Sequence, residues 1–107
     1  MSISEIEFEV PFAESVAVTG DTLRVDLSDG RSISVPLAWY PRLRHASIGE
    51  RKHWRLIGSG IGIHWEDLDE DISVEGLLAG RASNESQISF KRWLEARSRR
   101  ATRRSEA

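Results

Sequence analysis

The chain contains no cysteine and no long apolar run, and these two absences exclude several classes of protein. None of its 107 residues is Cys, which excludes a disulfide framework, a thiolate nucleophile and a cysteine-ligated zinc site. No apolar stretch approaches the roughly 20 residues that a membrane-spanning helix needs. The N-terminus is acidic and lacks the basic and then apolar layout of a signal peptide. We therefore expect a cytoplasmic protein that does not bind membranes.

Sequence motifs typical of small enzymes are absent as well. The chain has no nucleophile elbow, no phosphate-binding glycine loop and no metal-binding helix motif. The stretch Gly58-Ser59-Gly60-Ile61-Gly62 is rich in glycine. It is too short for a phosphate loop, and no helix with a lysine follows it, so it predicts a turn. The sequence therefore predicts a protein without catalytic residues and without a cofactor.

Charge is unevenly distributed along an otherwise ordinary globular composition. The residues are 39% hydrophobic and 30% charged, and a chain of this length can bury one modest core. Residues 91–107 carry seven basic side chains against two acidic ones, although the net charge of the whole chain is −2. This asymmetry predicts an acidic, compact domain over residues 1–82 and a C-terminal helix with a basic tail over residues 83–107.

Two segments near the middle of the N-terminal half predict a β-hairpin. Residues 23–28 and 31–37 alternate apolar and polar side chains, a pattern typical of half-buried strands. Asp29-Gly30 between them is a strong turn signal, because glycine adopts the positive φ that tight turns require. A shorter strand is expected at residues 16–19. We expect one face of the hairpin to form the centre of the core, with side chains from Leu23, Val25, Leu27, Ile33 and Val35.

A second hairpin and a short helix are expected after it. Residues 54–57 and 61–65 predict two strands that flank the glycine-rich turn. Ser47 and Glu50 fit a capping box, in which each side chain accepts a hydrogen bond from a free amide at the start of a helix. The sequence therefore predicts a short helix that leads into the second hairpin.

The remaining elements are helical and complete the expected fold. Ser73 is suited to cap a brief helix that Gly80 ends. A last helix begins near residue 84 or 86 and carries one apolar stripe that ends at Leu94, so we expect the basic end to fray. The fold class is predicted to be α+β, with a small, mainly antiparallel sheet built from two hairpins, short helices and a C-terminal helix.

Three blocks of the chain resemble a small bacterial family. They read Leu-Arg-Val-Asp-Leu-Ser-Asp-Gly-Arg at residues 23–31, Val-Pro-Leu-Ala-Trp-Tyr-Pro-Arg-Leu at 35–43, and Gly-Ile-His-Trp-Glu-Asp-Leu-Asp-Glu-Asp-Ile-Ser-Val-Glu-Gly-Leu-Leu at 62–78. In this order the blocks are similar to the family known as domain of unknown function 2442. The resemblance implies a compact α+β domain with an antiparallel sheet and supplies no catalytic residues. It also implies genetic pairing with a second small protein, of the domain-of-unknown-function 4160 type, in toxin–antitoxin modules.

The densest charge in the chain lies in the third block. Residues 62–74 hold a histidine and five carboxylates between apolar side chains. Burial of like charges is costly, so this run is either a solvated surface or a set of carboxylates held by partners. In the structural interpretation, His64 ends a strand and the carboxylates pair with nearby arginines, namely Arg42, Arg44, Arg51 or Arg55. The spacing does not match a calcium loop, because Leu68 and Ile72 interrupt it.

Our functional interpretation is a non-catalytic protein-interaction module. The resemblance makes it the antitoxin-like partner in a two-gene system, whose partner protein is a toxin of the domain-of-unknown-function 4160 type. Its acidic and aromatic face would consist of Trp39, Tyr40, Arg42, His64, Trp65, Asp67, Asp69, Glu70 and Asp71. Arginine and the large aromatics are preferred interface anchors, although the same aromatics are also typical of a protein core. An alternative is a small metal- or ligand-binding enzyme centred on His64 and the acidic run.

The basic tail supports a second alternative, which is non-specific binding of nucleic acid. Its candidate phosphate contacts are Arg97, Arg99, Arg100, Arg103 and Arg104. No aromatic residue follows Trp93, so we do not expect stacking on bases. The competing interpretation is a solvated, disordered end that is attracted to the acidic domain.

Overall fold

The computed structural model describes residues 10–106, with side chains described up to Arg100. Within this range the strands form two three-stranded antiparallel sheets in the orders β1-β2-β3 and β4-β5-β6. The strands are β1 (Ala13–Val18), β2 (Thr22–Leu27), β3 (Ser32–Pro36), β4 (Trp54–Ile57), β5 (Gly62–Trp65) and β6 (Glu70–Ser73). The helices are η2 (Leu37–Trp39), α1 (Pro41–Arg44), α2 (Ile48–Lys52), η3 (Glu66–Leu68), α3 (Val74–Leu78) and α4 (Gln87–Glu106). The α+β class predicted from the sequence is confirmed.

The hairpin of β2 and β3 forms as its alternation predicts. Leu23 pairs with Val35 and Val25 pairs with Ile33 across the two strands. Four of the five side chains expected on the core face are buried, and Ile33 is partly buried against them. Gly30 adopts φ +91° in the turn, a conformation that is strained for residues with a Cβ.

The second sheet contains a strand that the sequence analysis did not predict. The hairpin of β4 and β5 is present as expected, but β6 lies inside the acidic run and pairs antiparallel with β5. Its side chains alternate, since Ile72 is buried while Asp71 and Ser73 are exposed. The consecutive acidic residues before Ile72 conceal this period of two. Strand β6 completes a second three-stranded sheet with β4 and β5, whereas the sequence predicts one sheet built from the two hairpins.

The two sheets share one hydrophobic core. Buried side chains of β2, such as Leu23 and Val25, belong to the same cluster as Ile63 and Trp65 of β5. The sheets also meet at one edge, where the amide of Ala13 donates a hydrogen bond of 2.7 Å to the carbonyl oxygen of Gly60. A Cβ on Gly60, which has φ +113°, would lie 2.5 Å from the oxygen of Ala13. Glycine is therefore required for this approach of the two sheets.

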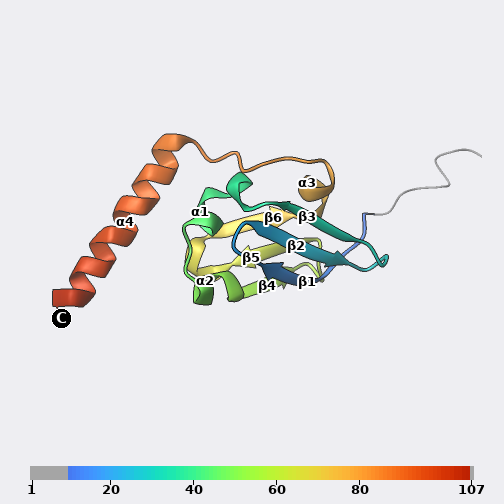
Figure 1. Cartoon of the computed structure of the whole chain (residues 1–107), viewed down its shortest axis with the longest axis horizontal. Helices are drawn as coiled ribbons and strands as arrows, with labels where there is room; N and C mark the ends of the chain where they lie inside the picture. The colour runs from blue at the N-terminus through green and yellow to red at the C-terminus, as the bar shows by residue number, and fades with distance from the viewer. Residues whose placement is uncertain (1–9, 107) are drawn as a thin grey trace, which may run out of the picture.

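The short helices have the caps that the sequence predicts. Ser47 and Glu50 form the capping box of α2, and the Ser73 side chain accepts from the amide of Gly76 in α3. These helices lie beside the sheets, with α1 and α2 at one end and α3 at the other (Figure 1). They complete a domain from which the C-terminal helix projects.

Helix α4 is longer than predicted. Ser86 caps its first turn by accepting from the amide of Ser89 at 3.1 Å. The helix then continues to Glu106, so the expected fraying after Leu94 is wrong. Alanine, arginine and glutamate in its second half are good helix formers, which sustains the helix after the apolar stripe ends. Figure 1 shows it projecting away from the sheets. Within residues 10–106, neither this helix nor any other combines the length and apolar character of a membrane span.

Candidate functional site

His64 lies on the outer face of the β4–β6 sheet, in a row of charged residues. The strand register places it between Arg55 and Asp71. Its Nδ1 forms a hydrogen bond with Asp71, and its Nε2 lies 3.6 Å from a carboxylate oxygen of Glu66. The hydrogen bond with Asp71 is the main reason that the pKa of His64 is raised. The histidine side chain is only 14% exposed, so its neighbours cover most of it.

The opposite face of the same sheet points into the core. Trp65 is fully buried, and its indole N–H donates a hydrogen bond of 3.0 Å to the backbone oxygen of Arg51. Trp65 is paired with Trp54 on one side and with Glu70 on the other. Because side chains alternate across a strand, Trp65 and His64 lie on opposite faces. Trp65 therefore offers no surface to a partner, and its expected interface role is corrected to a core role.

Glu70 is a half-buried carboxyl group at the edge of this inner face. Burial raises its pKa to about 7. Three neighbouring carboxylates contribute to this raised pKa, and the guanidinium of Arg42 opposes it. The three carboxylates belong to Asp69, Asp71 and Glu85. Glu70 thus differs from the other acids of the run, because it titrates near neutral pH and faces inward.

The remaining carboxylates of the run form an exposed surface that we call the acidic rim. Its residues are Glu66, Asp67, Asp69 and Asp71. Glu66 pairs with Arg55 at 3.0 Å, and Asp67 contacts Nδ1 of His53 at 2.8 Å. All four side chains in these pairs are at least 44% exposed, and such pairs contribute little to stability. The acidic rim is therefore a solvated surface that is only partly neutralised.

Only one of the four arginines proposed as structural partners forms an ion pair with this run among the described side chains. Arg55 does so, through Glu66. Arg51 donates to the backbone oxygens of Leu43 and Arg44, and Arg42 pairs with Glu85 outside the run. Asp67 and Asp71 contact histidines instead, and Asp69 is the one carboxylate of the acidic rim without an ion pair among the described side chains.

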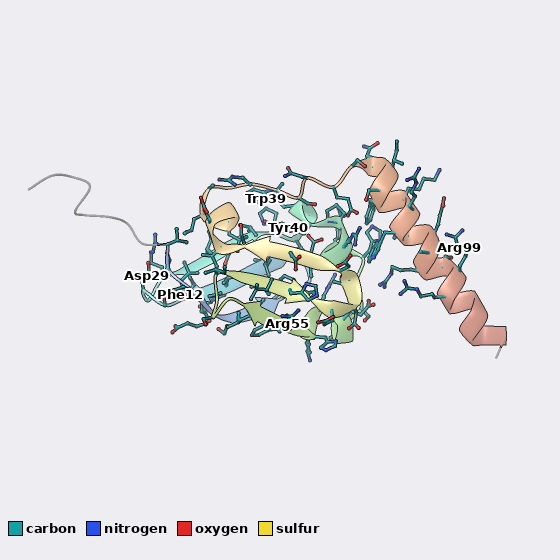
Figure 2. The ribbon with its side chains drawn as sticks, turned by 180° about the vertical axis from the view of Figure 1, so that it is seen from behind. Phe12, Asp29, Trp39, Tyr40, Arg55 and Arg99 are labelled. Carbon is teal, nitrogen blue, oxygen red and sulfur yellow. The ribbon has the colours of Figure 1, made fainter. Side chains whose placement is uncertain are left out.

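Two other residues expected at an interface lie against the segment that leads to α4. Tyr40 is only 4% exposed, and its hydroxyl donates a hydrogen bond of 3.1 Å to the backbone oxygen of Arg81. Trp39 is half-buried against the core, and its backbone oxygen accepts from the amide of Ser83 at 3.0 Å. Figure 2 shows both in the body of the domain. The expected interface role of Tyr40 is corrected to a core role, as for Trp65.

Arginines on either side of Trp93 attach the first half of α4 to the domain. Nε of Arg42 donates to both carboxylate oxygens of Glu85, at 2.9 and 3.0 Å. Arg97 makes two hydrogen bonds of 2.8 Å to Glu50. The guanidinium carbons of Arg42 and Arg97 lie 5.2 and 4.6 Å from the ring centroid of Trp93, within cation–π range. Arg42 and Arg97 therefore have internal partners, and we call this arrangement the helix clamp.

An apolar groove that the sequence analysis missed lies between β1 and α2. Its volume is about 450 Å³. The apolar lining comes mainly from Val16, Val18, Ile48 and Trp54, and the basic side chains are those of Arg51 and Lys52. Ile48 is 70% exposed, and β1 is an edge strand whose only partner in its sheet is β2. We call this feature the β1 groove. The one sequence signal for it is Ile48, an isolated apolar residue in a polar helix.

The residues that the sequence suggests as ligands for a metal ion or for nucleic acid do not come together in a closed site. Among the described side chains, no three His, Asp or Glu residues are grouped so that they could hold a metal ion. Arg99 and Arg100 are exposed on α4, and Figure 2 shows Arg99 on the projecting part of the helix. The side chains of Arg103 and Arg104 lie outside the described residues.

The region that holds both sheets matches a known family. Residues 13–83 match the family described as protein of unknown function (DUF2442). The chain belongs to this family. The resemblance found in the sequence is thereby confirmed. The DUF2442 match covers the acidic rim and the β1 groove and ends before α4 begins.

Two solved structures are similar to this DUF2442 chain. A crystal structure of a protein of unknown function from Rhodospirillum rubrum has 30% sequence identity and a TM-score of 0.61, and the match covers 72% of this chain and 95% of that one. A solution structure of an uncharacterised protein from Chromobacterium violaceum has 21% identity and a TM-score of 0.61, and the match covers 83% and 82% of the two chains. The second likeness shows the fold alone. No curated protein matches the chain.

Proposed function

We propose that the protein is a non-catalytic interaction module that binds a partner protein through the β1 groove and the acidic rim. The groove is the observation that carries the proposal. It joins the edge strand β1 to an apolar lining that includes Ile48 at 70% exposure. Edge strands accept an added strand from another chain, and pockets beside them select its side chains. A strand of a partner that pairs with β1 would place apolar side chains in the groove.

The first residues of β4, an edge strand of its sheet, lie between the β1 groove and the acidic rim. Trp54 lines the groove, while His53 and Arg55 on either side of it contact Asp67 and Glu66 of the rim. Because side chains alternate across a strand, Arg55 and Glu66 lie on the outer face of the sheet, so a partner seated in the groove would reach the carboxylates by extending around the edge of β4. This arrangement favours a partner with basic side chains next to an apolar strand. Complementary charge of this kind speeds association more than it tightens the complex.

The family resemblance supports a specific identity for that partner. We take it to be a small protein of the domain-of-unknown-function 4160 type, encoded beside this chain, which then acts as the antitoxin-like member of the pair. Burial of the β1 groove by such a protein would be the physical basis of neutralisation. The resemblance alone supports the pairing, and the β1 groove supplies a surface that is suited to it.

Two isoleucines with matched exposure test the proposal. Ile48 is 70% exposed in the groove, and Ile88 is 67% exposed on α4. Burial of one such side chain contributes roughly 1.5–3 kcal/mol, or about ten- to a hundredfold in affinity. After co-expression with the neighbouring gene product, we expect Ile48→Asp to weaken the complex by at least about tenfold, measured by titration calorimetry, and Ile88→Asp to leave it unchanged. Failure to form a complex at low salt, or equal losses in both variants, would contradict the proposal.

The non-catalytic part of the proposal has its own test at His64. The alternative enzyme would need His64 with Asp71 and Glu66 to act as a ligand set or as an acid–base group. We expect the metal content of the purified protein to be the same in wild type and in His64→Ala. A stoichiometric metal ion that is lost in the variant would favour the alternative.

A further inference from the structure

The hydrogen-bond pattern of β1 determines which of its backbone groups face away from its sheet. In an antiparallel pair of strands, residue pairs that exchange two hydrogen bonds alternate with pairs that exchange none. The amide of Thr19 donates to the carbonyl oxygen of Thr22 at 2.9 Å, and the register continues along β2 through Val18, Ala17 and Val16 in turn. Ala17 is therefore bonded to β2, whereas the N–H and C=O groups of Val16 and Val18 point away from it.

The bonds between β2 and β3 support the same assignment. The amide of Leu27 donates to the carbonyl oxygen of Arg31 at 2.8 Å, beside the end of β3. The register then makes Val25 and Leu23 the residues of β2 that exchange hydrogen bonds with β3. Arg24 lies between them in the sequence, so its backbone groups face the opposite strand, which is β1.

The stretch of β1 that can accept another strand is short. At the start of β1 the amide of Ala13 donates to the carbonyl oxygen of Gly60 at 2.7 Å, so the turn between β4 and β5 closes the edge there. Among residues 10–106, no backbone group pairs with the outward groups of Val16 and Val18. Unpaired backbone groups on an edge strand bind an added strand. Two residues are thus available for pairing, and both line the β1 groove.

The side chains of these two residues face the interior of the groove. Val16 is paired with Val25, and Val18 is paired with Leu23. Val25 and Leu23 are fully buried, so all four side chains lie on the inner face of the sheet. Helix α2 and the start of β4 supply the remaining apolar lining of the groove. A strand added beside β1 would therefore direct every second side chain into the groove.

We infer that the β1 groove binds an extended peptide segment that runs antiparallel to β1 and carries aliphatic side chains at two positions separated by one residue. This inference rests on the proposed function and specifies which segment of a partner the groove recognises. The two aliphatic residues lie opposite Val16 and Val18, and each exchanges two backbone hydrogen bonds with its counterpart. The residue between them lies opposite Ala17, makes no backbone bond to β1 and directs its side chain outward. Antiparallel pairing is favoured because it is more stable per residue than parallel pairing.

The first test compares two labelled peptides with blocked ends, whose binding to the full chain is followed by fluorescence anisotropy. The probe is Lys-Thr-Val-Thr-Val-Thr-Lys. The matched control is Lys-Val-Thr-Thr-Val-Thr-Lys, which has the same composition but directs its two valines to opposite faces of a strand. Because one more aliphatic side chain is buried, we expect the probe to bind at least about tenfold more tightly than the control. No binding of the probe, or equal affinities, would overturn the inference.

The second test removes backbone amides from each side of the pairing. N-Methyl groups on both valines of the probe should weaken binding at least about tenfold, whereas one on the central threonine should not. In the protein, Val18→Pro removes one outward amide and keeps the bonds with β2, since proline is tolerated at such edge positions. We expect Val18→Pro to bind the probe about threefold or more weakly than Val18→Ala does. A larger loss from methylation of the threonine than of the valines would overturn the antiparallel arrangement.

The complex with the neighbouring gene product separates this inference from the proposed function. Amide exchange followed by NMR should slow at Val16 and Val18 on binding, and Ile48→Asp should remove the effect. A complex that depends on Ile48 but leaves both amides exchanging as in the free protein would overturn the inference and leave the proposed function intact. No complex, with the peptide results as expected, would contradict the proposed function alone. A dimer of this chain that Val18→Pro dissociates would identify a second copy as the occupant and would overturn the inference.

Discussion

Replacement of Glu70 by glutamine should make the protein more stable at neutral and alkaline pH. Glu70 faces the core side of the β4–β6 sheet, and burial raises its pKa from 4.5 to about 7. The folded state thus holds this proton more tightly than the unfolded state does. Linkage then requires stability to fall as pH rises from about 4.5 to about 7. The difference between the two pKa values corresponds to about 3 kcal/mol at most, and Glu70→Gln avoids this loss because it is neutral throughout.

Urea unfolding of wild type and Glu70→Gln between pH 5 and pH 8, followed by tryptophan fluorescence, measures this effect. The pKa of His64 is also raised, so its contribution to stability is lost as pH rises, but it is present in both proteins and cancels in the difference. Glu14→Gln removes a carboxylate that is exposed on β1 and serves as the control. We expect the stability gain of Glu70→Gln to grow with pH up to about 7 and then to level off. A gain that is independent of pH, or a less stable variant at pH 8, would refute the reasoning.

Three further changes test the core and the helix clamp. Gly60→Ala should lower the free energy of unfolding by at least about 1 kcal/mol more than Gly30→Ala does. Both glycines have positive φ, but of the two only Gly60 would place a Cβ 2.5 Å from a backbone oxygen. Equal losses in urea unfolding would contradict this. Trp65→Phe should cost roughly 2 kcal/mol or more, since it removes ring volume and the indole hydrogen bond, and a loss below about 0.5 kcal/mol would count against the buried placement. A double-mutant cycle with Glu50→Gln and Arg97→Gln should give a coupling of about 1 kcal/mol that shrinks with salt, whereas additive losses would mean that the pair is not formed.

The parts of the fold that depend on local pattern could be predicted from the sequence. Alternation on both sides of Asp29-Gly30 gives the hairpin of β2 and β3, and Ser47 with Glu50 gives the cap of α2. Strand β6 could not be recognised in the same way. Three acidic residues precede Ile72, the one buried apolar residue of this strand. The pairing of β6 with β5 decides which of these acidic residues face the core.

The candidate site could be predicted only in part, because it depends on contacts between distant segments. The solvated acidic rim followed from the cost of burying like charges. Trp65 was placed wrongly on that surface, although it shares the strand parity of buried Ile63. The helix clamp joins Arg42 to Glu85, two residues far apart in sequence, and no local pattern links them. The β1 groove likewise exists only because β1 and α2 approach each other in the folded chain.

The most direct test of partner binding through the β1 groove is hydrogen–deuterium exchange of the protein alone and with the neighbouring gene product. We predict slower exchange on binding in residues 16–20 and 48–54, which flank the groove, because a strand added to β1 would occupy its free amides. Slower exchange confined to the outer face of the β4–β6 sheet or to α4 would contradict this account.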